Sequence, residues 1–109
     1  MQLYEVIRWG NDEDDPFTGG PNGHDTCFLV RAKSLEQAVQ LADAQLARMP
    51  HRRVQPWADA VYLLGEDSTE ANEPLILRGP YVQSAYRYGW RHWYREEPNG
   101  SWVERDQQE

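Results

Sequence analysis

The chain has 109 residues and a mass of 12.7 kDa, a length typical of one domain with one modest core. Its formal net charge of −7 argues against a general nucleic-acid binder, because such proteins need a basic surface for the phosphate groups. A single cysteine excludes an internal disulfide, and no apolar run approaches the roughly 20 residues that a membrane span needs. The N-terminal segment also lacks the pattern of a secretory leader. We therefore expect a cytoplasmic protein without membrane association.

The first part of the chain predicts two strands separated by a long loop. Aromatic and β-branched residues favour strands over residues 2–9 and 26–32. Between them, residues 10–25 contain four Gly, two Pro and two Asn, a composition typical of a loop. Long loops in small domains are often functional, and a mobile connection is the equally weighted alternative.

Residues 34–49 predict an amphipathic helix. The apolar positions recur at intervals of four, three, four and three residues: Leu35, Val39, Ala42, Leu46 and Met49. Ser34 and Gln37 form an S-x-x-Q capping box at the start, and Pro50 ends the helix. A helix that is apolar on one side only must pack on another element.

The second half of the chain predicts four more strands, over residues 57–64, 74–78, 87–96 and 101–105. A polar connector at 50–56 precedes them. Residues 79–88 leave two alternatives open: a short helical turn that begins at Gly79-Pro80, or an early start of the following strand. The last two strands are joined by a type I turn at 97–100, with Pro98 at its second position.

The resulting order β-β-α-β-β-β-β predicts an α+β fold. We expect a mostly antiparallel sheet of five or six strands with one helix packed on one face, in a single domain over residues 1–105. Residues 106–109 are expected to form a frayed tail. A sixteen-residue helix is about 24 Å long and about 10 Å wide, whereas six strands span about 24 Å. One helix therefore cannot cover the whole sheet face.

The segment RYGWRHWYR at 87–95 interleaves arginine with aromatic residues. The side-chain period of two gives it one face with Arg87, Arg91, Trp93 and Arg95. The other face carries Tyr88, Trp90, His92 and Tyr94. Because the helix needs large apolar partners, we expect the second face to pack against it. The arginine face should then form an exposed patch on the side of the sheet that the helix leaves open.

The acidic residues of the chain gather in loops, above all in the run Asp12, Glu13, Asp14 and Asp15. Such a run could hold a metal ion, but an EF-hand loop needs a Gly at its sixth position and a Glu at its twelfth. Both are missing here, and Pro16 interrupts the pattern. A solvated charge run is the favoured interpretation, and we expect no bound metal.

Catalytic motifs are also missing. His24, Asp25 and Cys27 are close in sequence, but Cys27 lies in a strand, where a lone cysteine is usually a small buried apolar residue. The chain contains no C-x-x-C, H-E-x-x-H, P-loop or dinucleotide-binding motif. We therefore expect neither an enzyme nor a bound cofactor.

The favoured hypothesis is a small acidic protein-binding module, of the class of inhibitors, immunity proteins or antitoxin-like adaptors. It would bind a basic protein partner through the open sheet face and the acidic loops, because Trp, Tyr and Arg are enriched at the centres of protein interfaces. The partner-binding residues would be Arg87, Arg91, Trp93, Arg95, Asp12, Glu13, Asp14 and Asp15. A homodimer through the same face is a variant of this hypothesis. The alternative is single-stranded nucleic-acid binding through residues 87–95, which the net charge disfavours.

Overall fold

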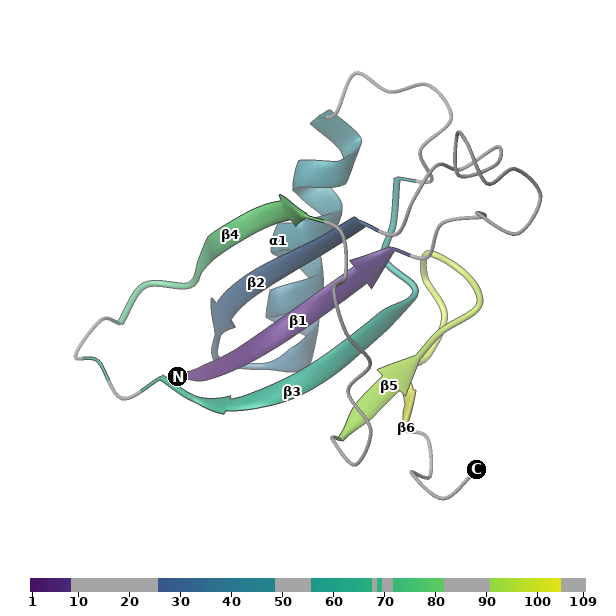
Figure 1. The fold of residues 1–109 in the computed structure, drawn as a ribbon. Coiled ribbons are helices and arrows are strands. Elements are labelled where there is room, and N and C mark those ends of the chain that lie inside the picture. The colour runs from purple at the N-terminus through teal and green to yellow at the C-terminus, as the bar shows by residue number, and fades with distance from the viewer. Residues whose placement is uncertain (9–25, 49–55, 68, 70–71, 82–90, 105–109) are drawn as a thin grey trace.

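The computed structural model describes residues 1–8, 26–48, 56–67, 69, 72–81 and 91–104 (Figure 1). This part of the chain forms one helix and a six-stranded antiparallel sheet, which confirms the predicted α+β fold and element order. The elements are β1 (Gln2–Arg8), β2 (Thr26–Ala32), α1 (Leu35–Arg48), β3 (Ala60–Glu66), β4 (Leu75–Tyr81), β5 (His92–Tyr94) and β6 (Val103–Glu104).

The strands lie in the order β4-β2-β1-β3-β5-β6. The two strands beside β1, β2 and β3, are each antiparallel to it and therefore parallel to each other. The connection between them needs a crossover, and α1 supplies it on one face of the sheet (Figure 1). After β3 the chain crosses to the edge of the sheet beyond β2, where β4 pairs with β2. The ends of the sheet are therefore β4 and β6.

The helix begins at the predicted capping box. The backbone N–H of Gln37 donates to Ser34 Oγ at 3.2 Å, and the Gln37 side chain accepts from the Lys33 N–H at 2.8 Å. Both bonds satisfy N–H groups that have no partner within the helix. The sequence pattern and the geometry thus agree on where α1 begins.

Ser34→Ala is expected to lower the free energy of unfolding by about 1 kcal/mol, because the capping bond from Gln37 is lost. Urea unfolding monitored by circular dichroism measures this change. Ser34→Asp is the matched control, since its carboxylate can accept the same bond. An alanine variant as stable as the wild type would contradict the capping role.

The main core lies between α1 and the sheet. The helix packs chiefly on β2, with further contacts to β1 and β4. Tyr4, Val6, Phe28 and Val30 fill this layer from the sheet, each at most 4% exposed. The helix packs on β1, β2 and β4, so the strands β5 and β6 lie beyond the part of the sheet that α1 covers (Figure 1).

The opposite face of the sheet was expected to be open, and this was wrong for its centre. Glu5, Ile7 and Cys27 on that face are fully buried, and Tyr62 and His92 are at most 9% exposed. Aromatic side chains contribute to this second layer: the rings of Tyr62 and His92 stack at 4.7 Å. Tyr81 reaches over from β4 and donates its hydroxyl to Glu5 Oε2 at 2.6 Å. A polar and aromatic layer therefore takes the place of an open face.

The last four strands differ from the predicted bounds. The third begins at Ala60 rather than Trp57, because Ala58 makes its backbone contacts with side chains, donating to Asp43 Oδ1 and accepting from Arg95. The fourth continues through Tyr81, so a helical turn beginning at Gly79 is wrong for residues 79–81. The last two strands are shorter than predicted. The turn at 97–100 is confirmed by the bond from Gly100 N–H to Glu97 O at 3.0 Å.

Candidate functional site

A groove lies between the flank of α1 and the hairpin that joins β5 to β6. Its cavity has a volume of about 340 Å³, within the usual size of ligand-binding pockets. The helix contributes Glu36, Gln40 and Asp43 to one wall, and the hairpin contributes Asn99 and Trp102 to the other. This groove exists because α1 packs toward β2 and β4, while the hairpin projects from the opposite part of the sheet.

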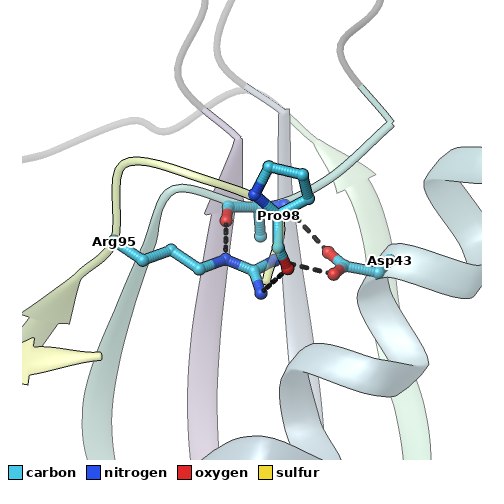
Figure 2. A network of polar contacts seen from close by, with 4 residues as sticks. Asp43, Arg95 and Pro98 are labelled. Atoms are coloured by element: carbon cyan, nitrogen blue, oxygen red, sulfur yellow. Dashed lines mark hydrogen bonds and ion pairs between the residues drawn. The ribbon is translucent and has the colours of Figure 1, made fainter. Parts of the chain in front are cut away.

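Arg95 is one of the residues that line this groove, and Figure 2 shows its polar contacts with Asp43 and Pro98. Its guanidinium donates from Nη2 to Asp43 Oδ2 at 2.7 Å, from Nη1 to the Pro98 carbonyl at 2.7 Å and from Nε to the Ala58 carbonyl at 2.9 Å. Asp43 in turn accepts the Ala58 N–H on its other oxygen at 2.8 Å. One side chain thus connects the helix, the start of β3 and the final turn.

Two tryptophans flank the same guanidinium. Its central carbon lies 4.6 Å from the ring centre of Trp102 and 5.6 Å from that of Trp57. Both distances are in the range of cation–π attraction. The Arg95 side chain is only 6% exposed. Its positive charge is neutralised by Asp43 and further stabilised by the two rings.

The predicted common face of Arg91, Trp93 and Arg95 is confirmed in part, but its placement was wrong. Trp93 packs against the core cluster on the helix side of the sheet, whereas Tyr94 belongs to the cluster on the other side. The expectation assumed that the helix must cover β5, whereas it covers β1, β2 and β4. Trp93 is half-buried and Arg95 is buried, so neither is an exposed contact.

Among the described members of this face, Arg91 is the one that is exposed, with 61% of its side chain accessible. Its guanidinium donates to both carboxylate oxygens of Glu104, at 2.7 and 3.0 Å, and lies 5.0 Å from the ring centre of Trp93. These hydrogen bonds lower the pKa of the Glu104 carboxyl and raise that of Arg91. The pair therefore carries no net charge at neutral pH.

Carboxylates dominate the charge around the groove. Glu36 lies on its wall, and Glu96 and Glu97 line an adjoining hollow of about 420 Å³ on the outer side of the hairpin. All three are exposed. Among the described residues none of them forms an ion pair, whereas both arginines of this region are paired. Burial, and next the charge of Glu36, raises the pKa of the Tyr4 hydroxyl.

The remaining predicted partner-binding residues lie outside the described part of the chain. They are Arg87, Asp12, Glu13, Asp14 and Asp15. The same holds for the loop at 10–25, for residues 82–88 of the ambiguous segment and for the tail at 106–109. Within the described residues, no group of three His, Cys, Asp or Glu side chains is placed to hold a metal ion. The helix found there is too short or too polar to cross a membrane.

Comparisons with known proteins found no match to this chain. No family model matches the chain, and neither the curated proteins nor the solved structures contain a match. The site must therefore be interpreted from its own geometry and charge.

The sequence did not indicate three residues that build the groove: Glu36, Asp43 and Trp102. In the sequence Asp43 is one of several polar residues on the helix, and nothing local distinguishes it. Its contact with Arg95 joins positions 52 residues apart, which only the tertiary structure brings together. A buried arginine needs an acidic partner. Placing Arg95 in the core would therefore have pointed to an acidic partner such as Asp43.

Proposed function

We propose that this protein is a non-catalytic protein-binding module that receives a basic segment of a partner protein in the groove between α1 and the β5–β6 hairpin. The observation that carries the proposal is the chemistry of this groove, in which Trp102 and Val39 lie beside the exposed carboxylate of Glu36, with the exposed carboxylates of Glu96 and Glu97 in the adjoining hollow. In this role it would belong with the small inhibitors, immunity proteins and antitoxin-like adaptors that neutralise a basic partner.

Charge and shape both support a cationic ligand. Among the described residues, the carboxylates of Glu36 and Asp43 line the groove, and those of Glu96 and Glu97 line the adjoining hollow. Arg95 is the one cationic side chain among the described residues that line the two hollows, and it is paired with Asp43, so their charge is negative like that of the whole chain. Opposite potentials across an interface speed association and select the partner. The cavity is large enough for one long side chain, such as lysine or arginine, between Trp102 and Glu36.

Binding of single-stranded nucleic acid has less support. It would use arginines to contact phosphates, but Arg95 is buried and its donors are directed at Asp43, Ala58 and Pro98. Arg91 is paired with Glu104, so a phosphate would have to displace a carboxylate. A strand rich in arginine and tryptophan is therefore explained by the packing of the hairpin.

The test uses a fluorescein-labelled deca-lysine peptide, a deca-glutamate peptide and a single-stranded RNA of similar length, compared by fluorescence anisotropy. We expect the basic peptide to bind and its affinity to fall as salt rises, because exposed charge pairs are screened. Glu36→Lys combined with Glu97→Lys should weaken this binding about tenfold, the effect of about 1.4 kcal/mol. Both residues are exposed, so folding should be unaffected.

The matched control combines Glu66→Lys with Glu73→Lys. It makes the same charge change at exposed positions that line neither hollow. Equal loss of binding in both double variants would show that the peptide senses only the net charge, and would overturn the groove as the site. Tighter binding of the RNA than of the basic peptide would favour the nucleic-acid alternative.

A further inference from the structure

The groove between α1 and the β5–β6 hairpin contains three side-chain acceptors that the fold does not use. Glu36 and Gln40 stand one turn apart on α1, with Cβ atoms about 6 Å from each other, and Asn99 lies on the hairpin wall. All three side chains are exposed, and none of them forms a hydrogen bond or an ion pair with another described residue. The groove therefore offers free oxygen atoms from both of its walls.

The fourth acceptor of the groove, Asp43, is already occupied. Its two carboxylate oxygens accept the backbone N–H of Ala58 and a guanidinium N–H of Arg95. Because the pair of Asp43 and Arg95 has no net charge, Glu36 gives the groove a net charge of about one negative unit. One cationic side chain would neutralise this charge and supply donors for the free oxygen atoms.

The groove already holds a guanidinium group in a setting of the same kind. The guanidinium of Arg95 lies 4.6 Å from the ring centre of Trp102 and donates to one carboxylate and two carbonyl oxygens. A guanidinium has five N–H donors in one plane, is weakly hydrated and stacks on aromatic rings, whereas the ammonium of lysine is compact and strongly hydrated. Acceptors on two walls, beside the apolar surface of Trp102 and Val39, therefore suit a guanidinium better than an ammonium.

We propose that the groove is specific for one arginine side chain in the basic segment of the partner protein. In this arrangement the guanidinium donates to the carboxylate of Glu36 and directs its remaining N–H groups to the amide oxygens of Gln40 and Asn99. The inference rests on the function proposed above for the same groove. It adds a selectivity that charge cannot provide, because arginine and lysine carry the same charge.

Gln40 is the residue that should separate the two cations. The charge of Glu36 attracts lysine and arginine alike. The neutral amide of Gln40 favours the ligand that has donors left after the carboxylate is satisfied, and arginine has more of them. Gln40 is exposed in the middle of α1, so a substitution there changes the groove without disturbing the core.

The test titrates the full-length protein with three blocked tripeptides, Gly-Arg-Gly, Gly-Lys-Gly and Gly-citrulline-Gly, up to about 10 mM, the range expected for one weakly bound side chain. Citrulline is the uncharged analogue of arginine. Two-dimensional NMR gives the affinities and the location, through the indole N–H of Trp102 and the side-chain amides of Gln40 and Asn99. We expect the arginine peptide to bind about fivefold more tightly than the lysine peptide, the effect of one hydrogen bond. The citrulline peptide should bind most weakly.

Two variants separate the attraction of charge from the recognition of shape. Glu36→Gln should weaken the arginine and lysine peptides to a similar degree. Gln40→Ala should weaken the arginine peptide about fivefold and the lysine peptide much less. The matched control is Gln45→Ala, the same change on the same helix at a position that lines neither hollow, and it should bind both peptides like the wild type. Alanine favours helices, so both alanine variants should stay folded.

The outcomes distinguish this inference from the function on which it rests. An arginine peptide that binds no more tightly than the lysine peptide, or does not bind, overturns the arginine specificity. If deca-lysine binding still depends on Glu36 and Glu97 in that case, the groove remains a site for basic segments. If the deca-lysine peptide also fails to bind, both proposals are overturned. Equal losses in Gln40→Ala and Gln45→Ala, or signals that move only outside the groove, overturn the assigned position.

Discussion

Arg95→Ala is expected to lower the free energy of unfolding by about 3–5 kcal/mol, the usual cost of removing one partner of a buried ion pair. The substitution leaves Asp43 without its guanidinium and leaves the carbonyls of Ala58 and Pro98 without a donor. It also opens space between Trp57 and Trp102. Because these contacts hold the final turn to the helix, the hairpin should lose its position at the same time. Chemical unfolding followed by tryptophan fluorescence measures the change.

One variant at this position separates charge from geometry, and one at an exposed ion pair supplies the comparison. Arg95→Lys retains the positive charge, but an ammonium group cannot direct planar donors at three fixed acceptors, so it should restore only part of the stability. The exposed pair of Arg91 with Glu104 supplies the comparison, and Glu104→Gln should have a far smaller effect because water screens it. If Arg95→Ala were as mild as Glu104→Gln, the connecting role of Arg95 would be refuted.

Leu46→Ala should destabilise the protein by about 2–5 kcal/mol, because the variant loses transfer free energy and leaves a cavity. Leu46 is 3% exposed and belongs to the cluster between α1 and the sheet. Urea unfolding gives the free energy, and an unchanged slope with denaturant would show that the two-state behaviour is preserved.

Leu41→Ala is the graded control on the same helix. Its side chain is only half-buried and packs at the margin of the same cluster, so the same chemical change should cost clearly less. Equal effects at both positions would mean that the buried stripe of α1 is misassigned. A Trp93→Ala variant should also lose stability, since Trp93 packs on this cluster, and it is therefore unsuitable as a pure binding variant.

The local patterns of the sequence were sufficient for the elements and the fold class. The S-x-x-Q box at Ser34 and the helical spacing up to Leu46 involve neighbours within a few residues, so the chain itself encodes where α1 begins and which side is apolar. The turn at 97–100 is encoded in the same way by Pro98 and Gly100. Six strands around one such helix leave few architectures other than an α+β sheet.

The sequence could not determine which sheet face meets the helix at β5. The side-chain period of two indicates that Arg91, Trp93 and Arg95 share one face of the strand. It does not indicate which of the two sides of the sheet that face belongs to. The side was decided by the pairing of β5 with β3 and by the position of α1 over β1, β2 and β4. The same long-range placement brought Arg95 to Asp43, 52 residues away, and turned a predicted exposed arginine into a buried one. Contacts of this kind depend on the whole topology, which no local pattern contains.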